Sequence, residues 1–132
     1  MRPSGRYGQV LLLVTAVLIG PGCVWLAAAG GAAAGAGAAV FYLGRLEQTV
    51  DGSVEEVYQA ALETLEAENL PVIEKKVDSM TARVESEYAD EKHIWIQMEE
   101  VAPERTKVWV RVGIVGDKDR SSRLLDGIKS RL

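Results

Sequence analysis

The stretch IWIQMEEVAPERTKVWVRV, residues 94–112, decides the fold expected for this chain. Apolar and polar residues alternate on both sides of its middle, which is typical of two strands that each bury one face. A turn centred on Ala102 is expected to join them as a hairpin. In that register Trp95 lies opposite Trp109, on the face that the buried isoleucines and valines do not use.

Further strands are expected on both sides of a helix that precedes this hairpin. The link Asp-Ser-Met at residues 78–80 favours a turn between two of them. Each expected strand is short and rich in β-branched residues. The expected strands cover residues 46–50, 72–77, 81–86, 94–100 and 105–112.

Two helices complete the domain. Ser53 and Glu56 form a capping-box pattern at the start of the first helix, which Pro71 bounds. Asp117 or Asp119 is expected to cap the second helix. Each helix has one apolar stripe, and that of the second comprises Leu124, Leu125, Ile128 and Leu132. The predicted fold is therefore α+β in two layers, with both helices on one face of an antiparallel sheet of about four strands, in the order (β)αββββα.

The two tryptophans of the hairpin mark a candidate contact surface. If helices cover only one face of the sheet, Trp95 and Trp109 lie on the open face, flanked by His93, Lys107 and Arg111. Exposed aromatic residues among charges form partner-binding patches in many proteins. Cross-strand tryptophans also stabilise open sheets that bind no partner. Both interpretations stay open at this point.

The composition does not favour an enzyme or a nucleic-acid-binding protein. Residues 1–44 contain two of the 15 Lys/Arg and none of the 19 Asp/Glu, so residues 45–132 carry a net charge of −6. An acidic domain repels phosphate backbones. His93 and Cys23 are the single residues of their kinds, and no nucleophile motif frames a serine. We expect no catalytic site, no metal site and no cofactor.

The N-terminus has the pattern of an export signal. Arg2 and Arg6 precede the apolar run Val10–Ile19, and small residues lead to Cys23. We expect residues 1–22 to be a lipoprotein signal peptide and Cys23 to carry acyl chains. An alternative cleavage site lies around residues 27–29, which are all alanine.

A second apolar block, residues 24–43, follows the cysteine. Ala27, Gly31, Gly35 and Ala39 recur at every fourth position, a spacing that lets membrane helices pack closely. We expect residues 23–44 to be a lipid anchor followed by an Ala/Gly-rich helix, which is either a tether or a membrane helix. If the signal stays uncleaved, Gly20-Pro21-Gly22 would turn a helical hairpin in the membrane.

Several of these features occur together in one known family. They are the Gly-Cys export start, the Ala/Gly-rich block, the passage YLGRLE at residues 42–47, SVEEVYQA at residues 53–60, and Gly113-x-x-Gly116-Asp117 before the last helix. This order resembles the small bacterial lipoproteins grouped as domain-of-unknown-function family 3568. The resemblance implies lipid anchoring at Cys23 and a place in the envelope, and it implies no activity. If Cys23 is lipidated, the residue that follows it, Val24 rather than Asp, is similar to the pattern of outer-membrane lipoproteins of Gram-negative bacteria.

Three functions remain open from the sequence. The first is a non-enzymatic envelope lipoprotein, anchored in the outer membrane, whose periplasmic domain of residues 45–132 binds an envelope protein or component. The second is a membrane protein that oligomerises through the small-residue stripe. The third is a periplasmic domain that binds a small ligand. The sequence does not determine the oligomeric state.

Overall fold

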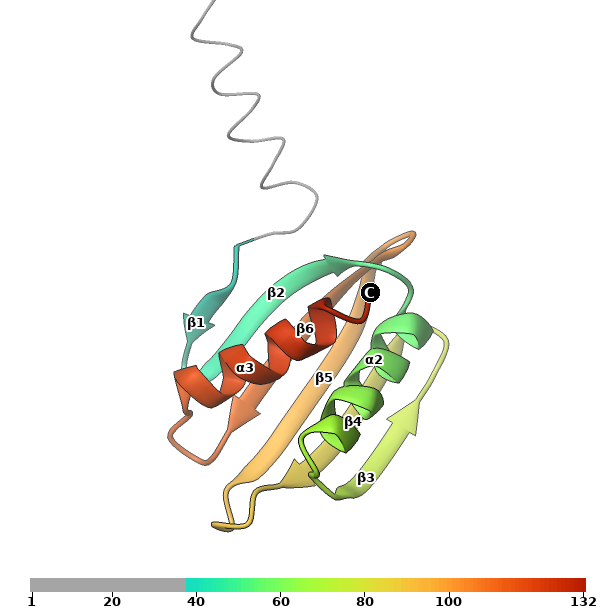
Figure 1. Cartoon of the computed structure of the whole chain (residues 1–132). Helices are drawn as coiled ribbons and strands as arrows, with labels where there is room; N and C mark the ends of the chain where they lie inside the picture. The colour runs from blue at the N-terminus through green and yellow to red at the C-terminus, as the bar shows by residue number, and fades with distance from the viewer. Residues whose placement is uncertain (1–37) are drawn as a thin grey trace, which may run out of the picture. The chain divides into compact units, whose positions relative to one another are not determined.

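The computed structural model describes residues 38–132, which form one antiparallel sheet of six strands with two helices on the same face (Figure 1). The α+β class and the two-layer arrangement are confirmed, but the sheet has six strands rather than about four. Its spatial order is β1-β2-β6-β5-β4-β3. The elements are β1 (Val40–Tyr42), β2 (Arg45–Asp51), α2 (Val54–Ala67), β3 (Val72–Val77), β4 (Thr81–Glu87), β5 (His93–Ala102), β6 (Arg105–Val112) and α3 (Lys118–Lys129).

Strand β1 is the element that the sequence analysis missed. Residues 40–43 were expected to belong to the apolar tether or membrane helix, but Val40–Tyr42 pairs with β2 at the edge of the sheet. Valine, phenylalanine and tyrosine all favour extended backbone. Leu43 and Gly44 both have positive φ, at 49° and 79°, as a two-residue hairpin turn requires. The local chemistry of this segment therefore directs it into the sheet.

The predicted signal peptide of residues 1–22 lies outside the described residues, as do Cys23, Ala27, Gly31 and Gly35. Ala39, the last residue of the small-residue stripe, lies in chain that is neither helix nor strand, directly before β1. No helix within residues 38–132 is long and apolar enough to cross a membrane.

Both helix starts follow from their capping residues. The Ser53 hydroxyl accepts a hydrogen bond from the Glu56 amide, and the Glu56 carboxylate accepts one from the Ser53 amide, so the predicted capping box is confirmed. Of the two candidate caps for α3, Asp117 is the one used. The predicted stripe of α3 is buried at Leu124, Leu125 and Ile128, but Leu132 follows the end of the helix and is half exposed.

The core lies between the two helices and the sheet. Helix α2 packs over β4 and β5, and α3 packs over β6 and β2. Alternate residues of each central strand face the helices and are nearly inaccessible to solvent, including Ile94, Ile96, Met98, Val108 and Val110. Each such side chain stabilises the fold by about 1.5–3 kcal/mol. None of the helices within residues 38–132 covers the opposite face of the sheet, and that face positions the candidate site.

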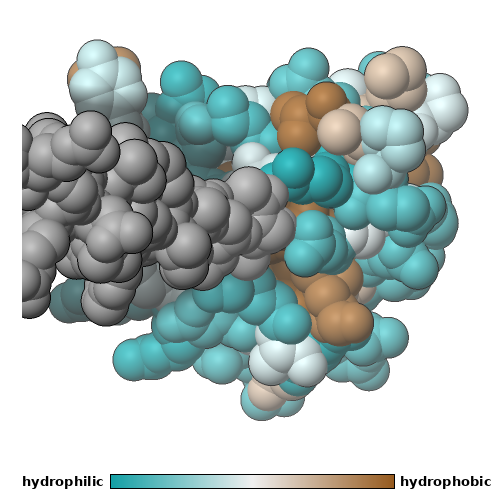
Figure 2. Space-filling view, turned by 90° about the horizontal axis from the view of Figure 1, so that it is seen from above, coloured by the Kyte–Doolittle hydropathy of each residue, from teal (hydrophilic) through white to brown (hydrophobic). Residues whose placement is uncertain are grey.

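At one end of the sheet, the described surface is mainly polar. Figure 2 shows it from the end of the sheet that carries the β5–β6 turn, where hydrophilic residues predominate and hydrophobic ones form small clusters separated by hydrophilic residues. Surfaces of this kind are ordinary for a domain surrounded by water.

Candidate functional site

The open face of the sheet brings the two predicted tryptophans together. Residues of β5 and β6 alternate between fully buried and half-buried positions, and Trp95 and Trp109 occupy half-buried positions on the face away from the helices. The predicted register between them is wrong, because Trp95 pairs with Arg111 and Trp109 pairs with Gln97. The two indoles are therefore diagonal neighbours rather than direct partners.

The difference between the predicted and the observed register has a local cause at the turn of the β5–β6 hairpin. The turn is formed by Pro103 and Glu104 rather than being centred on Ala102, and the register shifts between Glu100 and Ala102. Such a bulge places an extra residue, Val101, in one strand. The observed register differs from the predicted one by two residues, so every side chain keeps its predicted face.

Trp109 lies within a set of polar contacts contributed by β2 and β6. Its indole N–H donates to the Glu47 carboxylate, which also pairs with the Lys107 ammonium at 2.9 Å. The Lys107 ammonium lies 5.4 Å from the centre of the Trp109 ring. These contacts, led by the Lys107 hydrogen bond, hold the pKa of Glu47 below its usual value. Because the Glu47 carboxylate accepts the indole N–H of Trp109, it fixes the orientation of the indole.

Trp95 has a different set of neighbours. The centre of the His93 ring lies 4.4 Å from that of the Trp95 ring, and the His93 Nε2 atom lies 2.8 Å from the Glu85 carboxylate. The Arg111 guanidinium lies 5.9 Å from the Trp95 ring. Arg111 also donates to the backbone carbonyls of Gly113 and Ile114, so its position is fixed by the loop after β6.

Between the tryptophans the open face is hollowed. A cavity of 230 Å³ is lined by Arg45, Trp95, Gln97, Trp109 and Arg111. Within residues 38–132, neither arginine makes an ion pair of 4.0 Å or less with a carboxylate. Two guanidinium groups without such a partner, one amide and two indoles suit a ligand that has an anionic group and a flat apolar face.

The sequence alone indicates three of the five lining residues of this cavity. It placed Trp95, Trp109 and Arg111 on one face, because alternation along a strand fixes the face of each residue. It did not identify Arg45 or Gln97 as lining residues. Arg45 reaches the cavity only because β2 pairs with β6, and a pairing between strands so distant in sequence has no local signal.

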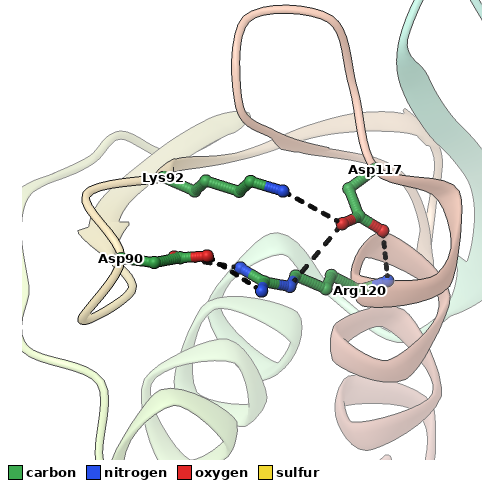
Figure 3. A network of polar contacts seen from close by, with 4 residues as sticks. All are labelled: Asp90, Lys92, Asp117 and Arg120. Atoms are coloured by element: carbon green, nitrogen blue, oxygen red, sulfur yellow. Dashed lines mark hydrogen bonds and ion pairs between the residues drawn. The ribbon is translucent and has the colours of Figure 1, made fainter.

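A second polar network lies at the end of the sheet where β6 leads into α3 (Figure 3). Asp117 accepts from the Arg120 amide and lies 3.6 Å from the Lys92 ammonium, and Arg120 bridges to Asp90 at 2.9 Å. The Arg120 amide, followed by the nearby cations, holds the pKa of Asp117 below its usual value. The network joins the β4–β5 turn to the start of α3, so we assign it a structural role.

Among the described residues, no group of three or more His, Cys, Asp and Glu side chains is arranged to hold a metal ion. Comparison with the curated proteins finds no match for this chain. Comparison with protein families finds a match to the family described as "Protein of unknown function (DUF3568)", whose profile matches residues 9–131. The chain therefore belongs to the DUF3568 family.

Proposed function

We propose that this chain is a non-enzymatic lipoprotein of the bacterial cell envelope whose folded domain binds a small carboxylate-bearing ligand, such as an acidic sugar, on the open face of its sheet. The single observation that carries the binding proposal is the cavity between Trp95 and Trp109. The envelope location is supported by the pattern around Cys23 and by the uncharged run of residues 7–44.

The chemistry of the cavity favours a small acidic ligand over a large flat partner. Arg45 and Arg111 line the cavity and would donate to a carboxylate bound there, and charge-assisted hydrogen bonds of this kind are about twice as strong as neutral ones. The half-buried indoles offer a flat apolar surface to the body of the ligand. Gln97, which pairs with Trp109 across the strands, adds an amide that donates and accepts hydrogen bonds.

The binding test is a titration followed by nuclear magnetic resonance of the indole N–H groups. The probe is N-acetylmuramic acid, a sugar with a carboxylate, and N-acetylglucosamine is the uncharged control. We expect the signals of Trp95 and Trp109 to shift with the acidic sugar, while the signal of Trp25 serves as internal reference. Equal shifts with both sugars, or no shift with the acidic one, would contradict the proposal.

Two variants separate the cavity from general charge effects. Arg45→Gln removes one donor of the cavity and is expected to weaken binding about tenfold or more, because hydrogen bonds to charged groups contribute about 1.5–3 kcal/mol. Arg123→Gln removes an exposed positive charge on α3, on the other side of the domain, and is expected to leave affinity unchanged. Similar losses in both variants would point to unspecific attraction.

The anchoring part of the proposal has its own test. Cells that express the chain are grown with labelled palmitate, and incorporation is compared with that of Cys23→Ala. We expect label only in the unaltered chain, because thioether and amide acylation both require this cysteine. Label that persists in Cys23→Ala would reject lipidation at this residue.

A further inference from the structure

The four most exposed large apolar side chains of the described domain all lie at one place. Val115 is 88 %, Ile114 83 %, Leu43 69 % and Tyr42 66 % exposed. Leu43 belongs to the β1–β2 turn and Ile114 and Val115 belong to the loop between β6 and α3, which lie side by side in Figure 1. We call these four residues the apolar tip.

The two segments of the apolar tip are held together by a close approach of backbone. A Cβ atom built on Gly116 would lie 2.1 Å from the Gly44 carbonyl oxygen, and one built on Gly44 would lie 2.4 Å from the Val115 carbonyl oxygen. Both positions therefore require glycine. Residues 42–43 are thus fixed beside residues 114–115, although about 70 residues of chain separate them.

The loop that carries Ile114 and Val115 is also braced from its base. Arg111 donates to the carbonyls of Gly113 and Ile114. At the other end of the loop, Asp117 caps α3 and pairs with Lys92 (Figure 3). The fold therefore displays these apolar side chains on a supported loop, instead of covering them with neighbouring residues.

We infer that the apolar tip inserts into the surface of a lipid bilayer and gives the folded domain a membrane contact of its own. The uncharged run of residues 7–44 ends in this turn, with Tyr42 and Leu43 as its last large residues. The tip thus continues the segment of the chain whose composition suits a membrane. Tyrosine is enriched at membrane interfaces, and a membrane contact of the folded domain adds to the attachment that the proposed acyl chains give.

The charges around the apolar tip fit an interface in which apolar insertion supplies most of the attraction. Arg45 and Lys118 are exposed cations close to it, and Glu91 is an exposed acid that lines the same hollow as Ile114 and Val115. Because both signs are present, attraction to anionic lipids is expected to be modest. The contact should therefore persist when salt screens charges.

The experiment measures the depth of one position of the full chain in vesicles. The chain is reconstituted into vesicles of phosphatidylethanolamine and phosphatidylglycerol that carry a quencher on their acyl chains. A fluorophore is attached to Val115→Cys, and the matched control is Ser79→Cys, in the exposed β3–β4 turn at the opposite end of the sheet. Any label on Cys23 is the same in both samples and cancels in the comparison.

We expect several-fold stronger quenching at position 115 than at position 79, and we expect Ile114→Ser to reduce the quenching at position 115. Equal quenching at both positions would overturn the inference, even if the protein sediments with the vesicles and the proposed anchor stands. Strong quenching at position 115 without palmitate on Cys23 would support the apolar tip and reject the anchor. If the chain does not sediment with vesicles, the membrane contact itself is overturned.

This inference goes beyond the proposed function and relies on it only for bringing the domain to the membrane. If the apolar tip binds a protein instead of a membrane, it has no partner in this experiment, because these vesicles contain no other protein. In that case position 115 would show no quenching.

Discussion

Replacing Gly116 by alanine tests the close approach on which the apolar tip depends. Gly116 has φ of +94°, where a side chain costs about 1–2 kcal/mol. The new Cβ would also lie 2.1 Å from the Gly44 carbonyl oxygen and 2.3 Å from the Gly44 Cα. Both are backbone atoms, so the β1–β2 turn must move away by about 1 Å or more, which resembles overpacking and costs about 1–3 kcal/mol.

The matched control for this substitution is Gly113→Ala in the same loop. Gly113 also has positive φ, at +74°, but the nearest atom to its added Cβ is the Lys92 side chain at 3.9 Å. Only the backbone strain of about 1–2 kcal/mol applies there. We therefore expect Gly116→Ala to lose about 2–5 kcal/mol of unfolding free energy in total, and Gly113→Ala to lose only the strain.

The assay is urea unfolding of the full chain, followed by far-ultraviolet circular dichroism, together with thermal melting. In a domain of this size, each kcal/mol of unfolding free energy corresponds to roughly 4–8 °C of melting temperature, and the two variants are expected to differ by about 1–3 kcal/mol. If Gly116→Ala is as stable as Gly113→Ala, the two segments do not touch as described. In that case the β1–β2 turn would not support the loop that carries Ile114 and Val115.

Three further predictions concern the fold. Ser53→Ala removes the cap of α2 and should lower the unfolding free energy by about 0.5–2 kcal/mol in urea titrations, whereas an unchanged midpoint would contradict the capping box. Leu65→Ala empties a fully buried site and should cost about 2–5 kcal/mol by the same measurement, so a cost under about 1 kcal/mol would argue against the packing of α2 on the sheet. Because the pKa of Asp117 is lower in the folded state, its contribution to stability is present above the unfolded pKa of 3.8 and is lost as pH falls through the folded pKa. Asp117→Asn should therefore flatten the loss of stability below about pH 4, and identical pH profiles of the two proteins would refute this.

The sequence predicted those elements whose signals are local. The strands Val72–Val77 and Arg105–Val112 have the bounds expected from the sequence. The capping box at Ser53 and Glu56 located the start of α2, since both partners lie within one helical turn. Alternation also assigned Trp95 and Trp109 to the open face, because it needs no knowledge of the partner strand.

What could not be predicted depends on contacts between distant segments. Strand β1 has only three residues and lies in a segment whose composition suggests a tether. Its pairing with β2 stabilises it. The approach of Gly44 to Gly116 involves two turns far apart in the chain, and neither glycine differs locally from an ordinary turn residue. The register of the hairpin depended on one bulge, which alternation does not reveal.

The open face and the apolar tip give the proposed lipoprotein two separate surfaces. The cavity between the tryptophans would take the ligand, and the apolar tip would contact the membrane. Arg111 belongs to both, because it lines the cavity and bonds to the carbonyls of Gly113 and Ile114. Its replacement is therefore expected to affect ligand affinity and membrane depth together.

The most direct test of the central proposal, an envelope lipoprotein anchored at Cys23, is the intact mass of the mature protein extracted from membranes. We expect a chain that begins at Cys23 and carries acyl groups. The mass of the full chain, or of a chain cut within residues 27–29, would contradict it.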